Sequence, residues 1–181
     1  MVRFEPGTTW LRQVHGAVAV EVRQPGEHAG VEADALFTST PGCRLAVRTA
    51  DCIPVVLAGD GTVGVVHAGW RGLAAGVIQA TARAMGSVTT AHIGPHIRRG
   101  CYEFGEDDLA EVVNAFGDGV RATTTWGTPA LDLTAGARAA LADIGDIRVD
   151  DGGACTACSD VYFSWRARRE PERFATIAWL E

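Results

Sequence analysis

The stretch from Leu45 to Gly72, LAVRTADCIPVVLAGDGTVGVVHAGWRG, constrains the fold of this chain more than any other. Two apolar runs, Pro54–Ala58 and Val63–Val66, flank the segment 59–62, GDGT. An Asp-Gly pair between two such runs is the strongest short-range signal for a β-hairpin. The sequence therefore predicts two antiparallel strands joined by a tight turn.

The register of this hairpin decides how Cys52 and His67 lie relative to each other. A two-residue turn at positions 59 and 60 places them directly opposite, with their Cβ atoms about 4.5–5.5 Å apart. A turn at positions 60 and 61 places them diagonally on the same face. Only a loop of odd length sends them to opposite faces of the sheet. Two of these three registers bring a thiol and an imidazole together.

A neighbouring thiol and imidazole have three interpretations. Cys52 and His67 could ligate Zn²⁺, they could form a Cys–His nucleophilic pair, or a small buried cysteine could lie beside an unrelated histidine. The following segment, 68–72, AGWRG, favours a site. It is a glycine-rich turn that carries a cation and leads into a helix, and helix N-termini bind anions.

Composition limits the classes of function. The 181 residues suggest a single domain over residues 1–181, and 47% hydrophobic residues suffice for a full core. A net charge of −6 argues against nucleic-acid binding, which needs a basic face. No stretch approaches the ~20 apolar residues of a membrane span, and MVRFEPGTTW lacks the apolar core of a signal peptide. We therefore expect a cytoplasmic protein without a membrane partner, with its five cysteines reduced.

The remaining periodic segments predict helices and strands on both sides of the hairpin. Apolar spacing and glycine stops predict helices at Leu73–Met85, Glu106–Phe116 and Thr134–Ile144. Further strands are expected at Ala17–Val22, Val88–Ile93, Ile147–Val149 and Arg173–Leu180.

Several polar or reactive residues outside the hairpin have two interpretations each. Asp34, just before an apolar pair, is either a functional acid or a capping residue. His92 and His96 flank a Gly-Pro turn, where a histidine is more often structural or exposed than a ligand. The motif Cys155–Cys158, CTAC, lacks a second CxxC or a histidine pair, so we favour a structural loop over a zinc or redox site. The aromatic run 161–166 forms either a pocket wall or part of the core.

Taken together, these motifs resemble the YfiH-type proteins, also called laccase-domain or peptidoglycan-editing-factor proteins. The resemblance covers nearly the whole chain in the right order. It rests on QVHG at 13–16, ADAL at 33–36, TADCIP at 49–54, HAGWRG at 67–72, IGP at 93–95, CYE at 101–103 and CT…FSWR between 155 and 166.

The resemblance implies a zinc site made by His15, Cys52 and His67, with a fourth position open to water. The resemblance adds only His15 to the candidate ligands, because two of the three hairpin registers already bring Cys52 and His67 together. Copper is the less favoured metal: cysteine and histidine also bind copper, but multicopper oxidation needs many more than the five histidines present.

The resemblance also implies chemistry on purine nucleosides, by deamination of adenosine or by phosphorolysis of adenosine, inosine or methylthioadenosine. Zinc lowers the pKa of water to about 7, which would serve hydrolytic attack on adenine. The candidates for phosphate binding are Arg48, Arg71 and the helix start at Gly72. Asp51 or Asp34 would move protons.

Two alternatives remain open at this point. Cys52 could be the nucleophile and His67 the base of an amide hydrolase that edits cytoplasmic peptidoglycan precursors. The chain could instead bind a nucleoside without turning it over.

The fold implied by the resemblance is α+β, a four-layer αββα sandwich with mixed sheets. The chain departs from the pattern at its start, because only twelve residues precede Gln13 where family members carry several dozen. We therefore expect an N-terminally shortened domain in which a partner subunit completes the pocket or the activity is reduced. An exposed sheet edge would favour a homo-oligomer.

Overall fold

The computed structural model describes residues 4–181. Its strands are β1 (Thr8–Arg12), β2 (Ala19–Glu21), β3 (Val31–Glu32), β4 (Ala35–Thr38), β5 (Arg44–Thr49), β6 (Ile53–Gly59), β7 (Thr62–Ala68), β8 (Thr90–Ile93), β9 (Arg121–Thr123), β10 (Pro129–Leu131), β11 (Arg148–Asp151) and β12 (Phe174–Ala178). Its α-helices are α1 (Trp70–Ala74), α2 (Val77–Met85), α3 (Glu106–Phe116), α4 (Leu133–Ala142) and α5 (Trp165–Arg168), with 3₁₀ turns η1 (Arg99–Cys101) and η2 (Asp118–Val120). Each helix in this part of the chain is too short or too polar to cross a membrane.

The predicted hairpin forms the centre of a six-stranded sheet with the order β11-β8-β6-β7-β4-β2. Gly59 lies opposite Thr62 and Pro54 opposite His67, so the two-residue turn falls at positions 60 and 61. This is the second of the predicted registers, with Cys52 and His67 placed diagonally. The sheet is mixed, because its two edge strands run parallel to their neighbours while the central pairs are antiparallel.

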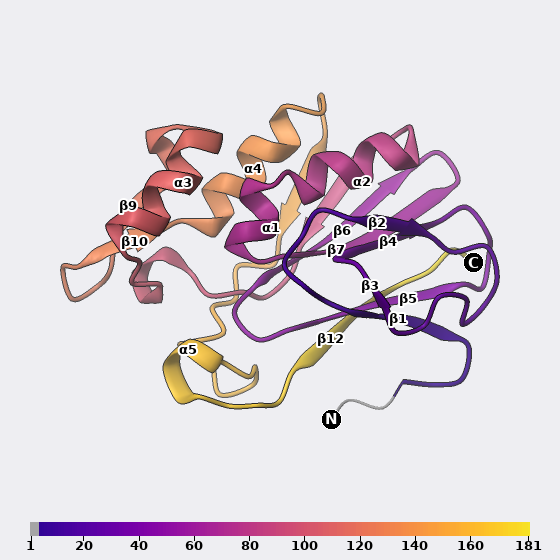
Figure 1. Cartoon of the computed structure of the whole chain (residues 1–181), viewed down its shortest axis with the longest axis horizontal. Coiled ribbons are helices and arrows are strands. Elements are labelled where there is room, and N and C mark those ends of the chain that lie inside the picture. The colour runs from indigo at the N-terminus through magenta and orange to yellow at the C-terminus, as the bar shows by residue number, and fades with distance from the viewer. Residues whose placement is uncertain (1–3) are drawn as a thin grey trace.

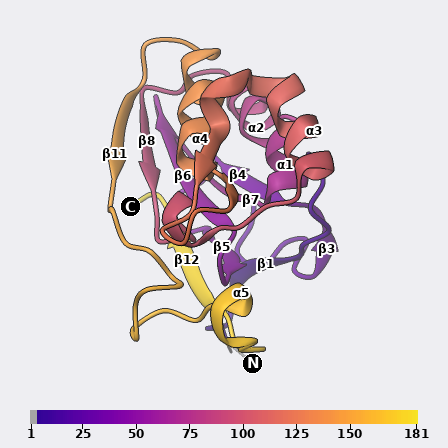
Figure 2. The same ribbon diagram turned by 90° about the vertical axis from the view of Figure 1, so that its left-hand side faces the viewer.

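A second sheet, ordered β12-β5-β1-β3, lies against one face of the first (Figure 1). Helices α1 to α4 gather on the opposite face of the six-stranded sheet (Figure 2). β7 is therefore covered on both faces: Val65 belongs to the core between the sheets and Val66 to the core under the helices. Burial on both sides explains why this strand is apolar without alternation.

The α+β class with mixed sheets is confirmed. Helices α1 to α4, the six-stranded sheet and the four-stranded sheet form three layers in residues 4–181 (Figures 1 and 2), and α5, which is four residues long, lies beyond the end of β12. The helix expected at Leu73–Met85 is two helices, α1 and α2. Gly76 between them adopts φ +80, in the left-handed region that glycine tolerates. The small side chains around it hide this break from an analysis of apolar spacing.

The other predicted elements are present with adjusted ends. α3 spans the predicted residues, and α4 begins at Leu133 because the Asp132 carboxylate accepts the N–H of Ala135 as an N-cap. The observed strands β2, β8 and β12 are each shorter than the predicted runs.

His96 is a structural histidine and gives the fold a predictable response to acid. Its Nδ1 lies 2.8 Å from the carbonyl oxygen of Gly94 and its Nε2 lies 2.9 Å from Thr134 Oγ1. Burial lowers the pKa of His96 from 6.5 to about 4. Between these values the unfolded chain binds a proton that the folded chain does not, so stability falls as pH falls. We expect His96 to account for a loss of about 2 kcal/mol between pH 7 and pH 5.

Urea unfolding of metal-free protein at the two pH values measures this loss. The difference in the free energy of unfolding between pH 7 and pH 5 should shrink in His96→Gln. It should persist in His92→Gln, because His92, four residues earlier in β8, is exposed and bonded to Asp150. An unchanged difference in His96→Gln would show that other groups cause the acid sensitivity.

Candidate metal and substrate site

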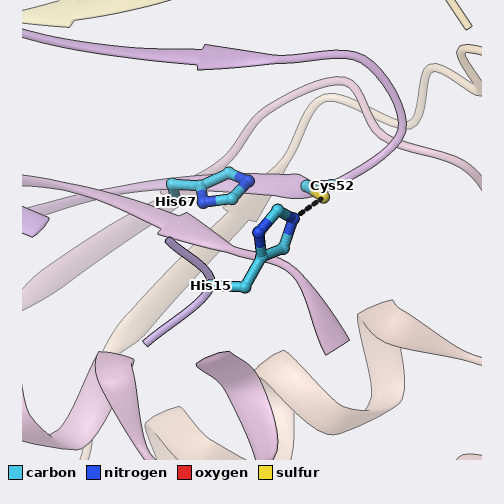
Figure 3. Close-up of side chains that lie close together, drawn as sticks. All are labelled: His15, Cys52 and His67. Carbon is cyan, nitrogen blue, oxygen red and sulfur yellow. Dashed lines mark hydrogen bonds between the residues drawn. The ribbon is translucent and has the colours of Figure 1, made fainter. Parts of the chain in front are cut away.

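Three side chains from three separate segments converge at one end of the hairpin (Figure 3). His15 lies in the loop after β1, Cys52 in the connection between β5 and β6, and His67 near the end of β7. Their ligand atoms all lie within 4.8 Å of one another. Cys52 Sγ is 3.8 Å from His15 Nε2, and the two imidazole rings meet edge to face with centroids 4.9 Å apart. The structure thus brings together the three residues predicted as ligands.

Asp34 holds this group in place through hydrogen bonds. Its carboxylate is fully buried and accepts His67 Nδ1 at 2.8 Å, together with the backbone N–H groups of His15 at 2.9 Å and Gly16 at 2.7 Å. Burial alone would raise the pKa of Asp34, but the hydrogen bonds from His67 and the backbone outweigh it and lower that pKa. The carboxylate therefore fixes the loop that carries His15 and leaves Nε2 of His67 free for the site. Such carboxylate–histidine pairs are a regular support of metal ligands.

The protonation of Cys52 and His67 suits a metal. Burial opposes charge on Cys52, but hydrogen bonds from His15 and His67 lower its pKa from 9 to about 6. Burial likewise opposes charge on His67, but Asp34 and Cys52 raise its pKa from 6.5 to about 9. Without metal, the site near neutral pH holds a thiolate beside an imidazolium. Zinc binds thiolate directly and replaces the proton of the imidazolium, so the donor set fits this ion.

Gly69 is required by the close approach of the three segments. A Cβ atom there would lie 2.5 Å from Cδ2 of His15 and 3.2 Å from Sγ of Cys52. Gly72 has a similar role, because its Cβ would lie 2.8 Å from the carbonyl oxygen of Gly16. Helix α1 begins at Trp70, so Gly72 lies buried in the first turn of the helix rather than before it. Its role in phosphate binding stays a prediction.

Asp51 precedes Cys52 of the His15–Cys52–His67 group, but its carboxylate faces the C-terminal segment. Its backbone adopts φ +92, an uncommon conformation for a residue with a side chain. The carboxylate accepts Thr156 Oγ1 and Ser164 Oγ, each at 2.7 Å, and the N–H of Arg166 at 2.6 Å. Asp51 thus anchors the segment that forms one wall of the site. Both Asp34 and Asp51 already accept internal hydrogen bonds. Their proposed role in proton transfer stays a prediction.

Two adjoining hollows open at the His15–Cys52–His67 group. One, of about 580 Å³, is bordered by Arg48 and Arg173, and the other, of about 310 Å³, by Arg71 and Arg166. His15, Ala50, Cys52 and Trp165 border both. The site therefore combines metal-ligand candidates with cations on two sides.

The sequence singled out only part of this lining. Arg48 and Arg71 were predicted, whereas Arg173 and Arg166 were not assigned a role. The aromatic run 161–166 left a pocket wall and a core position equally open. The structure places Trp165 in the wall, with 45% of its surface exposed. Arg173 had no local signal, because only the tertiary fold brings the start of β12 to the hairpin.

Comparison with known proteins identifies the family of this chain. The family model described as multi-copper polyphenol oxidoreductase laccase matches residues 1–181. A protein of Streptomyces griseus named purine nucleoside phosphorylase is 42% identical over 182 residues, which cover 95% of this chain and 74% of the relative. A protein of the same name from Mycobacterium tuberculosis H37Rv is 38% identical over 181 residues, covering 95% and 72%.

Solved structures show the same fold. A Neisseria meningitidis protein of the DUF152 family superposes with a TM-score of 0.87 at 32% identity, covering 97% of this chain and 76% of its own. The YfiH protein of Bacillus licheniformis gives a TM-score of 0.84 at 26% identity, covering 97% and 74%. The chain therefore belongs to the laccase-like YfiH family.

Proposed function

We propose that this protein is a zinc-dependent purine nucleoside enzyme that cleaves nucleosides by phosphorolysis and also deaminates adenosine. The observation that carries this proposal is the His15–Cys52–His67 group at the junction of two arginine-lined hollows. The relatives named purine nucleoside phosphorylase support the substrate class.

We propose zinc as the metal, and the number of histidines argues against the ligand set of a multicopper oxidase. His15, Cys52 and His67 would hold the ion, which when bound acts as a Lewis acid and lowers the pKa of a bound water. Asp34 orients two of the three ligands through its hydrogen bonds. The three remaining histidines, His28, His92 and His96, lie outside the group, so the chain does not offer the larger ligand set of a multicopper oxidase.

The walls of the site offer separate contacts for phosphate and for a purine. The guanidinium groups of Arg48 and Arg71 are held over the rings of Trp10 and Trp70, at 5.4 and 4.1 Å from the ring centroids. Stacking fixes each planar cation while its N–H groups remain able to donate to phosphate oxygens. The half-exposed indole of Trp165 borders both hollows and provides a face for stacking a purine.

A product assay tests the proposal. Chelator-treated protein and the same protein with zinc restored are incubated with inosine and phosphate, and free base and ribose 1-phosphate are measured. Adenosine is tested in parallel for ammonia. We expect phosphate-dependent release of the base only when metal is present. If the zinc-bound protein releases neither free base from inosine nor ammonia from adenosine, the proposal is refuted.

The arginines give a more specific prediction. Arg48→Ala and Arg71→Ala should each raise the KM for phosphate about 10- to 100-fold, because a hydrogen bond to a charged group contributes about 1.5–3 kcal/mol. The KM for the nucleoside should change much less. Arg83→Ala, an exposed arginine of α2 away from both hollows, is the matched control. An effect confined to the nucleoside KM would remove these arginines from the phosphate site.

An amide hydrolase with Cys52 as nucleophile is the second candidate. The lowered pKa of Cys52 beside His67 favours it, since a thiolate is the reactive form of cysteine. This candidate predicts turnover in metal-free protein and alkylation of Cys52 that substrate blocks. A third, non-catalytic candidate predicts saturable nucleoside binding with neither base nor ammonia released.

A further inference from the structure

A second group of thiols lies apart from the first site. It consists of Cys101, in the 3₁₀ turn η1, and Cys155 and Cys158 of the CTAC motif. The three sulfur atoms lie within 4.8 Å of one another, and those of Cys101 and Cys158 are 2.9 Å apart. The sequence alone could not reveal this group, because 57 residues separate Cys101 from Cys158.

Backbone N–H groups surround the sulfur of Cys155. The N–H of Arg98 donates to it at 3.4 Å, and the N–H groups of Ala157 and Cys158, two and three residues further on, are close enough to favour its charged form. The hydrogen bond from Arg98 therefore ties the motif to the segment that directly precedes η1.

Cys101 brings a third sulfur atom to the two in the motif, and its sulfur lies 2.9 Å from that of Cys158. Three thiolates cannot gather at this distance without a positive charge between them. A bound cation supplies that charge, and a coordinating thiol is deprotonated outright.

The surrounding chain holds the motif in place. The guanidinium of Arg98 forms a paired interaction with the Asp151 carboxylate, one bond of which measures 2.9 Å, and its Nε donates to the carbonyl of Ala154 at 3.4 Å. The backbone of His96 pairs with Ala154 and Thr156 on either side of Cys155. The loop thus presents its two cysteines to η1 with its ends fixed.

We propose that Cys101, Cys155 and Cys158 bind a second zinc ion through their three sulfur atoms. Three protein ligands leave one position of a tetrahedral ion. Cys101 also borders a cavity of about 730 Å³. The chemistry selects a thiophilic ion, since calcium and magnesium prefer oxygen ligands.

The position of the motif gives this ion a role. Thr156, between the two cysteines of the motif, donates its hydroxyl to Asp51 at 2.7 Å, and Asp51 precedes Cys52 in the chain. A zinc ion that joins the motif to η1 fixes the segment that anchors Asp51 and carries Trp165. The second ion therefore supports the wall of the first site without taking part in its chemistry.

Metal titration of the full chain under reducing conditions tests this proposal. In His67→Ala, which removes a ligand of the first site, one equivalent of Co²⁺ should still bind, with the intense charge-transfer absorption of several thiolates. Adding Cys158→Ala should abolish that band, while adding Cys43→Ala should not, because Cys43 is buried near the start of β5 and outside both groups. Circular dichroism confirms that each variant is folded, and Cys155→Ser provides a second disruption.

Proteolysis provides an independent readout. Zinc should slow cleavage within residues 152–164 of His67→Ala at least several-fold, and should have no effect there when Cys158→Ala is also present. Two results would overturn the proposal. One is that reduced His67→Ala binds no thiophilic metal, and the other is that mass analysis finds a Cys101–Cys158 disulfide that forms in preference to metal binding.

Discussion

Replacing His67 with alanine is expected to remove one zinc equivalent per chain and to reduce phosphorolysis at least about 10³-fold. The loss follows from the proposed site, in which His67 would supply one of three ligand atoms while its Nδ1 is held by Asp34. Lewis-acid stabilisation is worth several kcal/mol, and each 1.36 kcal/mol is a factor of ten in rate. Elemental analysis and the base-release assay measure the two effects.

His92→Ala is the control for this experiment. His92 is an exposed histidine bonded to the carboxylate of Asp150, so it resembles His67 in its partner but lies outside the ligand group. Its replacement should leave both zinc content and turnover unchanged. If His67→Ala kept its full zinc content and lost less than about tenfold in rate, His67 would not be a ligand.

Cys52→Asp separates the metal enzyme from the hydrolase with a cysteine nucleophile. Carboxylate is itself a zinc ligand, so this variant should retain part of the metal and part of the turnover if Cys52 binds zinc. If Cys52 attacks the substrate as a thiolate, the variant should be inactive whatever its metal content.

The sequence correctly predicted those elements whose structure is determined by residues within or next to the element. The Asp-Gly turn limited the register to few options, and the observed one places Cys52 and His67 on one face. The carboxylates in its first turn and the glycine after its last residue correctly predicted both ends of helix α3. The break at Gly76 was missed, because left-handed backbone at one glycine leaves no mark on apolar spacing.

The parts of the site that could not be predicted from spacing depend on tertiary contacts. His15 was selected only by the resemblance to a family, since its position depends on a carboxylate 19 residues away. Arg173 reaches the site from the start of β12, and Cys101 meets the CTAC motif across 57 residues. Chemistry at such a site is visible in the sequence only when the contacting segments happen to carry motifs.

Asp34→Asn is expected to weaken zinc binding about 10- to 100-fold and to lower the free energy of unfolding by about 3–5 kcal/mol. The asparagine amide retains one oxygen acceptor. Its NH₂ group, however, must face a group that donates a hydrogen bond to the wild-type carboxylate, either His67 Nδ1–H or the N–H of Gly16. The substitution therefore leaves a buried donor unpaired, and when that donor is His67 Nδ1–H it also removes the hydrogen bond that fixes the imidazole ring. Zinc titration and urea unfolding measure the two losses.

Asp150→Asn provides the matched comparison, because Asp150 also bonds the Nδ1 atom of a histidine at 2.8 Å but is exposed. An exposed pair contributes at most about 1 kcal/mol, so that variant should be close to wild type. Equal losses in the two variants would contradict the organising role of Asp34. Turnover at saturating zinc then separates two functions of this carboxylate: recovery of kcat indicates that Asp34 positions the ligands, whereas a kcat that stays low indicates that it moves a proton.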